Sequence, residues 1–231
     1  MIKSILLRLV VLSAFLLVIP GGARADDAKT LAASSESALE YVNRLLKDER
    51  WAGARNLIGA AKGVAIITDV KKASFIVGYE SGNGVILSRH GEDWSDPIAI
   101  RMSATSLAFQ AGAQEADIIM VILTRSALNE LVEGIFKVGG SGGFALGEWG
   151  AGGRAGGSIS GGVEVLTLSI SEGLFLGGGI EGMNIALNED ANNGAYGESV
   201  GEVLAKPGGE TQGAVGLREA LSKAVRQSWF E

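Results

Sequence analysis

The sequence predicts an α+β fold: a mainly antiparallel, glycine-rich and curved β-sheet, barrel- or sandwich-like, with flanking helices at its N-terminal and C-terminal ends. Apolar residues recur at helical spacing near both ends of the chain, in residues 30–50 and 215–229. The segments between them include short, β-branched, apolar runs that turn residues separate. Half of residues 139–162 are glycine, which lets strands bend sharply and approach closely.

The first 25 residues have the pattern of a secretory signal peptide, with cleavage after Ala25. A basic start, an apolar run over residues 9–19 and small residues at positions −3 and −1 of the cleavage site make up this pattern. The alternative is a membrane anchor, but the run of 11 residues is shorter than the ~20 that a spanning helix needs. We therefore predict a leader over residues 1–25 and one mature domain over residues 26–231, exported to the periplasm or secreted, with membrane association possible.

Charge and cysteine content limit the class of partner. Removing the leader takes away three of the 20 basic residues and none of the 26 acidic ones, so the net charge changes from −6 to −9. An acidic chain of this kind argues against nucleic acid as a partner. The chain has no cysteine, so an exported protein of this length must be stabilised by its hydrophobic core and not by disulfides.

The first predicted elements are two helices. In residues 30–50, apolar residues recur every three or four positions, and charged residues fill the other side. A second, shorter helix is predicted over residues 54–63, where Gly63 ends it.

The hydrophobic period then changes to that of strands. Three strands are predicted, over residues 63–70, 74–80 and 85–89. Lys71 and Lys72 lie between the first two, which places them at an exposed turn. "SGNG" (81–84) predicts a second turn, and "HGEDWSDP" (90–97) a third.

A buried strand, a helix and a hairpin follow. Residues 117–124 are almost wholly apolar, which indicates a strand buried on both faces. Residues 126–136 have a helical pattern that Thr124 or Ser126 can cap. Residues 163–170 and 174–182 are predicted to form a hairpin, and "NEDANNGAYG" (188–197) a polar loop before the final helix. Because Phe, Leu and Trp are interleaved with the glycines, residues 144–182 are predicted to be ordered sheet and not a linker.

Motifs for catalysis are present only as fragments. "GGSGG" (139–143) matches the nucleophile elbow around Ser141, but that elbow needs a strand before it and a helix after it. Residues 140–145 and 150–155 match a dinucleotide-binding form, yet neither lies between a strand and a helix. We therefore predict no catalytic residues, no enzymatic activity and no cofactor.

A metal site is also not predicted. A chain with no cysteine and one histidine lacks the usual ligands for zinc. Residues 188–194 resemble a calcium loop, but Ala191 and Val200 occupy two ligand positions. The single histidine, His90, is expected in an exposed turn and not as a catalytic base.

Several segments together resemble the SYLF domain, a lipid-binding family that is also described as the actin-binding domain of a yeast actin-patch protein. In order, they are "AKGVAII" (61–67), "ESGNGVILSR" (80–89), "WSDP" (94–97), "DIIMVILTRSAL" (117–128), "SISEGLFLGGGIEG" (169–182) and "AYG" (195–197). The resemblance covers about residues 35–228. Two segments depart from the family pattern: Ile170, Ser171 and Glu172 stand where the family often has Arg-Ser-Lys, and Ala151 replaces a proline.

The resemblance implies a phospholipid-binding module without known catalysis. Eukaryotic members bind phosphoinositides with the help of an N-terminal amphipathic helix, which would correspond to residues 30–50 here. Bacterial members are typically exported proteins. The expected partner is therefore an anionic phospholipid or membrane surface, and the alternative is a scaffold module that binds another protein and no lipid.

Charge gives a candidate lipid site in residues 44–72, which carry a net charge of +4 in an acidic chain. The candidate residues are Arg44, Lys47, Arg50, Arg55, Lys62, Lys71 and Lys72. A basic patch beside an amphipathic helix is attracted to an anionic membrane surface. The alternative is that this helix packs on the sheet and its charges are solvated.

Overall fold

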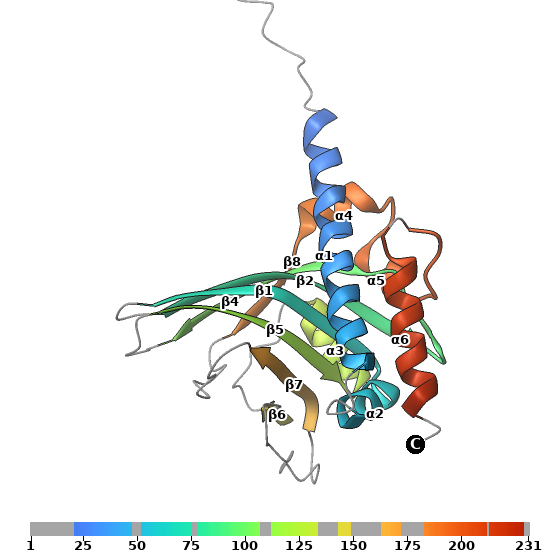
Figure 1. Ribbon diagram of the computed structural model, residues 1–231. Helices are drawn as coiled ribbons and strands as arrows, with labels where there is room; N and C mark the ends of the chain where they lie inside the picture. Colours follow the sequence, from blue (N-terminus) through green and yellow to red (C-terminus); the bar gives the residue numbers. More distant parts are fainter. Residues whose placement is uncertain are drawn as a thin grey trace, which may run out of the picture.

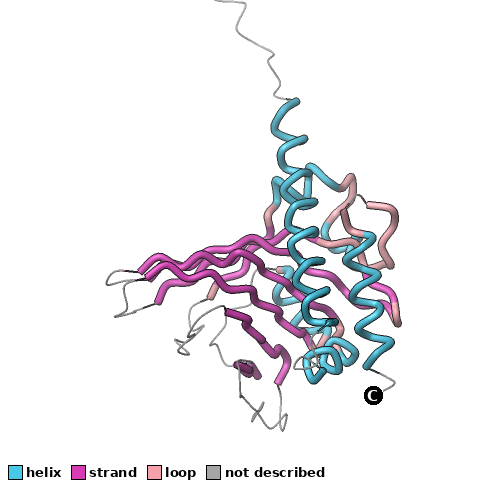
Figure 2. The backbone as a smooth tube through the Cα atoms, in the orientation of Figure 1, coloured by secondary structure: helices cyan, strands magenta, loops and turns pink. Residues whose placement is uncertain are grey.

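The computed structural model describes residues 21–47, 52–74, 78–106, 112–133, 143–148, 163–171, 183–211 and 213–228. The helices are α1 (Gly21–Lys47), α2 (Ala52–Ala60), α3 (Arg125–Val132), α4 (Glu189–Ala195), α5 (Val200–Leu204) and α6 (Val215–Ser228). The strands are β1 (Gly63–Ser74), β2 (Gly78–His90), β3 (Asp93–Trp94), β4 (Ile98–Ser106), β5 (Gly112–Ile122), β6 (Gly143–Glu148), β7 (Val163–Ser171) and β8 (Asn184–Leu187). Figures 1 and 2 show a curved sheet with helices against it.

The sheet confirms the predicted fold class. Its strand order is β6-β7-β5-β1-β2-β4-β8, with β3 paired to β2. All pairs are antiparallel except β6 with β7, which is parallel. The strands curl into a half-barrel, and helices from both ends of the described chain, α1 and α6, flank it (Figure 1).

Each face of the central strands carries its own hydrophobic core, because successive side chains point to opposite faces. On β1, Ile66 lies in the core beneath α1, α2 and α6, and its neighbour Ile67 lies in the core with α3 and α5. The first core contains Tyr41, Leu45, Ile58, Leu87, Trp94 and Leu221, all nearly inaccessible to solvent. Helix α1 therefore packs its apolar side on the sheet.

Several predicted elements are confirmed with small changes of boundary. The two N-terminal helices, the buried strand over residues 117–124 and the final helix are present as α1, α2, β5 and α6. Thr124 caps α3, since its side chain accepts a hydrogen bond from the Ala127 amide at 3.2 Å. In the glycine-rich region, β6 and β7 are strands as predicted; residues 149–162 and 172–182, including the second arm of the predicted hairpin, lie outside the described residues.

The turns predicted at Lys71 and Lys72 and at residues 81–84 are wrong. Lys71 and Lys72 lie inside β1, and residues 81–84 lie inside β2. Glycine is needed at position 84 for close approach between strands and not for a turn. A Cβ atom there would overlap the carbonyl oxygen of Ile66 and lie 2.9 Å from the Cα of Ile67.

The predicted polar loop over residues 188–197 is also wrong, because α4 occupies most of it. The Asn188 side chain caps this helix by accepting a hydrogen bond from the Ala191 amide at 3.4 Å. The buried side chain of Asn192 bonds both backbone groups of Ala99, accepting from the amide at 2.7 Å and donating to the carbonyl at 3.0 Å. These asparagines hold the helix to β4, so their abundance does not mark a solvent-exposed turn.

The close approach at Gly84 gives a stability prediction. Gly84→Ala should lower the free energy of unfolding by about 3 kcal/mol, because two strand backbones must move apart. The matched control is Gly201→Ala in α5, where a Cβ atom meets nothing within 4 Å and alanine favours the helix. Urea unfolding of both variants measures the difference, and equal stability of the two would contradict the packing argument.

Candidate functional site

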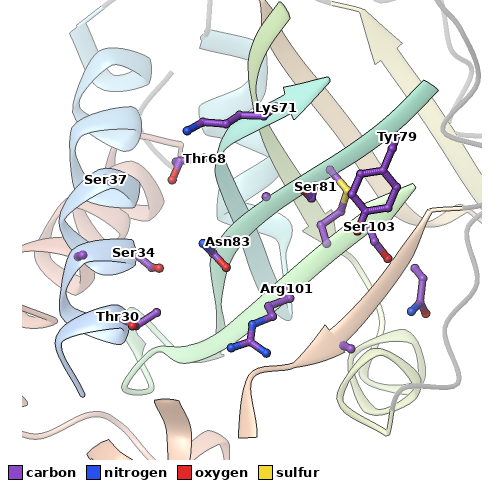
Figure 3. A pocket seen from close by; sticks show the side chains of 15 residues that line it. Thr30, Ser34, Ser37, Thr68, Lys71, Tyr79, Ser81, Asn83, Arg101 and Ser103 are labelled. Atoms are coloured by element: carbon purple, nitrogen blue, oxygen red, sulfur yellow. The ribbon is translucent and has the colours of Figure 1, made fainter. Parts of the chain in front are cut away.

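A polar pocket lies where α1 crosses the sheet beyond the apolar core. Its volume is about 640 Å³. The lining residues come from α1, β1, β2, β4 and β8: Thr30, Ala33, Ser34, Ser37, Thr68, Lys71, Tyr79, Ser81, Gly82, Asn83, Arg101, Met102, Ser103, Asn184 and Ala186. Figure 3 shows the strand residues on one side and the serines and threonine of α1 on the other.

Strand register builds the floor of the pocket. Asn83 of β2 is opposite Arg101 of β4, and Ser81 is opposite Ser103. Residues directly opposite each other in an antiparallel pair share a face, so all four line the same side of the sheet. On β4, residues that alternate with them, such as Ile100, are buried in the core on the other side.

A β-bulge brings Lys71 to this floor. The register of β1 shifts between Thr68 and Lys71, which pair with Asn83 and Ser81 respectively. One extra residue on β1 reverses the alternation, so that Val70 enters the core with α3 and Lys71 joins the pocket. Without the bulge, the lysine side chain would point into an apolar core.

The wall of the pocket is the polar part of α1. Thr30, Ser34 and Ser37 contribute hydroxyl groups to this wall, and Ala33 contributes only a small methyl group. In the following turns of α1, the side that faces the sheet is apolar and buried, with Tyr41 and Leu45 in the core. The pocket therefore begins where both the helix and the strands change from apolar to polar residues.

The charge of the pocket lining is positive. Lys71 and Arg101 are the charged residues of the described lining, which contains neither a carboxylate nor a histidine. Within the described part of the chain, the recorded ion pairs join other groups, Arg44 to Asp117, Lys206 to Glu198 and Arg218 to Asp96. Both cationic side chains extend toward α1, with Asn83 between them (Figure 3).

The backbone separation of Lys71 and Arg101 allows both long side chains to reach one small anionic group. They stand on β1 and β4 with β2 between, which separates their Cα atoms by about 12 Å. Long side chains directed inward from that separation can reach a single phosphate. The surrounding hydroxyl and amide groups of serines, threonines and asparagines can donate and accept further hydrogen bonds.

The structure does not gather the predicted basic residues into one patch. Arg44 is exposed on α1, but its guanidinium pairs with Asp117 of β5 and lies 5.6 Å from the ring centroid of Tyr41. Burial and the nearby Asp117 raise the pKa of Tyr41, so its phenol stays neutral. Lys47 and Lys62 are exposed near α2. Lys62 lies about 30 Å along β1 from Lys71.

One of the remaining predicted residues is buried, and the side chains of two others lie outside what the structure describes. Arg55 is 7% exposed and thus buried in α2. Arg50 and the side chain of Lys72 lie outside the described residues. Of the predicted set, Lys71 is the residue that lines the pocket.

Arg101 was not among the predicted residues, yet the sequence of its segment indicates a strand with one polar face. In "IAIRMSATS" (98–106), Ile100, Met102 and Ala104 alternate with Arg101 and Ser103. Strict alternation indicates a strand with one polar face. The neighbouring polar positions of β2 and β8 come from segments far apart in the chain, so only the register reveals that they meet.

The residues that the structure describes form neither a metal site nor a membrane-spanning helix. They contain no group of three or more His, Cys, Asp or Glu side chains that could hold a metal ion. His90 ends β2, half-buried and not exposed as expected, with Nε2 2.9 Å from the Leu204 carbonyl oxygen. No described helix has both the length and the apolar character required to cross a bilayer.

Fold and pocket together define a half-barrel module with a cationic, polar pocket beside its N-terminal helix. A family model described as "Ysc84: Las17-binding protein actin regulator" matches residues 103–224. The chain belongs to this Ysc84 family, whose domain is the SYLF domain, as the sequence resemblance indicated.

The curated relatives include fungal and vertebrate proteins. The chain is 31% identical over 180 residues to LAS seventeen-binding protein 3 of Saccharomyces cerevisiae, covering 74% of this chain and 39% of that protein. It is 32% identical over 180 residues to Protein YSC84 of the same yeast, covering 74% and 38%. It is 29% identical over 145 residues to SH3 domain-containing YSC84-like protein 1 of Xenopus laevis, covering 62% and 43%. The chain thus spans about two-fifths of the length of these relatives.

Proposed function

We propose that this protein is a non-catalytic module that binds anionic phospholipid headgroups in the pocket between α1 and the sheet. One observation carries the proposal: Lys71 and Arg101 both line this pocket, and the lining residues that the structure describes include no carboxylate. An anionic membrane surface attracts each nearby basic residue by about 1 kcal/mol. No histidine or carboxylate that could act as a general base is among the described lining residues, which supports binding without catalysis.

The pocket is a better candidate than an inserting N-terminal helix. Helix α1 buries Leu31, Tyr41 and Leu45 against the sheet and pairs Arg44 with Asp117. Insertion of its apolar side into a bilayer would require the helix to leave this core. A phosphate can enter the open pocket with α1 in place.

The cellular setting is part of the proposal. We propose that the leader predicted over residues 1–25 directs export, and that residues 26–231 act as one lipid-binding domain in the periplasm or outside the cell. Residues 1–20 of the leader lie outside the described residues. Intact-mass measurement of exported protein should show a chain that begins at Asp26, and a retained Met1 would contradict export by this route.

A second candidate function is a protein-interaction module without a lipid ligand. The family description names Las17 binding and actin regulation, and relatives carry names that refer to LAS seventeen and to SH3 domains. A protein-binding surface of this kind does not require two cations in a polar pocket. Lipid binding therefore separates the two candidates.

Vesicle flotation tests the proposed function. The protein should float with phosphatidylcholine vesicles that contain phosphatidylglycerol or phosphatidylinositol, and it should stay behind with pure phosphatidylcholine. Raising NaCl from about 0.1 M to about 1 M shortens the Debye length from about 10 Å to about 3 Å and should weaken binding. Failure to float with any anionic vesicle would favour the protein-interaction module, and equal binding to neutral vesicles would contradict recognition of the headgroup charge.

A further inference from the structure

Tyr79 is unusual among the large apolar side chains that the structure describes, because 54% of it is exposed. The other large apolar side chain that is exposed in the described residues is Val215, at the start of α6 on the helical side of the sheet. Tyr79 instead lies at the start of β2 and lines the pocket beside the polar floor. An exposed aromatic ring therefore lines the same pocket as Lys71 and Arg101, in which no described lining residue is a carboxylate.

Strand register places the ring and the cations on the same face. Ser81 is opposite Lys71, and Tyr79 is two residues from Ser81, so all three side chains share that face. Glu80 lies between Tyr79 and Ser81, and alternation directs its carboxylate to the other face of the sheet. This end of the sheet extends beyond the helices (Figure 1), so the helical layer does not cover it.

The opposite end of β1 offers a weaker surface for a membrane. Lys62 is exposed there and Lys47 ends α1, but Arg55 is buried and Arg44 is paired with Asp117. No large apolar side chain among the described residues of α2 or the start of β1 is exposed. Among the described residues, that end therefore provides charge without an exposed aromatic side chain.

We infer that the membrane docks on the pocket end of the sheet, with Tyr79 inserted at the lipid–water interface while Lys71 and Arg101 hold a headgroup phosphate. Tyrosine suits this position because its ring is apolar and its hydroxyl remains hydrated. The inference rests on the proposed function, and it adds the surface, the orientation and the anchoring residue. The pocket end, and not the α1–α2 end with Lys47 and Lys62, faces the lipid.

Site-specific labelling tests the orientation. Because the chain has no cysteine, Tyr79→Cys and Lys62→Cys each allow one environment-sensitive nitrobenzoxadiazole label on the full-length protein. Both positions are exposed, so a label at either should leave the fold intact. The probe is a phosphatidylcholine vesicle that contains phosphatidylglycerol, and flotation of each labelled protein is measured in parallel with fluorescence.

The expected result is a blue shift and a several-fold increase in emission at position 79 and little change at position 62. Loss of flotation with the label at position 79 but not at 62 would also support docking through this end. A response at position 62 alone, or at both or neither position while both proteins float, would overturn the inference and leave lipid binding intact. Failure of unlabelled protein to float would instead overturn the proposed function on which it rests.

Discussion

The double substitution Lys71→Glu and Arg101→Glu should nearly abolish binding to vesicles that contain phosphatidylglycerol. Each cation contributes about 1 kcal/mol near an anionic surface, and each new carboxylate costs a similar amount. The sum is about 4 kcal/mol, or roughly a 1000-fold rise in the apparent dissociation constant. The slope of binding against salt concentration should become shallower, because two of the interacting charges are reversed.

A control variant with the same change of net charge distinguishes the loss of the two pocket cations from a general increase in the negative charge of the protein. Lys47→Glu with Lys62→Glu reverses two exposed lysines outside the pocket lining. We expect this variant to bind within a few-fold of the parent, since its charges lie beyond a Debye length of about 8 Å from the pocket. Equal loss in both variants would show that the pocket is not the site. Thermal unfolding should be similar for all three proteins, because none of the four residues forms an ion pair recorded within the described residues.

The fold was largely predictable because its signals are local. The apolar positions of α1, the continuous apolar run of β5 and the cap at Thr124 each depend on residues close in sequence. Two of the errors share one cause, which is that a residue type that favours turns makes a tertiary contact instead. Gly84 allows β1 to approach β2, and Asn192 bonds the backbone of Ala99, so neither marks a turn.

The site was predicted less well, because it depends on register and on charge pairing. Counting charge along residues 44–72 gave the same weight to Arg55, which is buried, to Arg44, which is paired, and to Lys71, which lines the pocket. A single bulged residue before Lys71 decides the face on which that lysine lies. Arg101 joins the lysine only through the pairing of β4 with β2 and β2 with β1, which composition cannot reveal.

A large loss of stability, similar to that of Gly84→Ala, is expected for Asp96→Ala, which removes the centre of a network between β3 and α6. Asp96 is 9% exposed, and its Oδ2 accepts hydrogen bonds from the Gly209 amide at 3.1 Å and the Thr211 hydroxyl at 2.7 Å. Its Oδ1 lies 3.4 Å from Nε of Arg218, a distance and geometry that make an ion pair and not a hydrogen bond. Arg218 also donates to the Gly209 carbonyl, so both residues fix the segment before α6.

Alanine at position 96 removes the acceptors and leaves Arg218, whose side chain is 16% exposed, without its counter-charge. Breaking a buried ion pair in this way costs about 3 kcal/mol of the free energy of unfolding. Asp96→Asn keeps an acceptor for Gly209 or Thr211 but not the charge, so it should fall between the parent and alanine. Asp96→Ala combined with Arg218→Met should regain part of the loss, since no buried cation remains. Urea unfolding of the four proteins measures these differences, and a loss below about 1 kcal/mol for Asp96→Ala would show that solvent replaces the network at little cost.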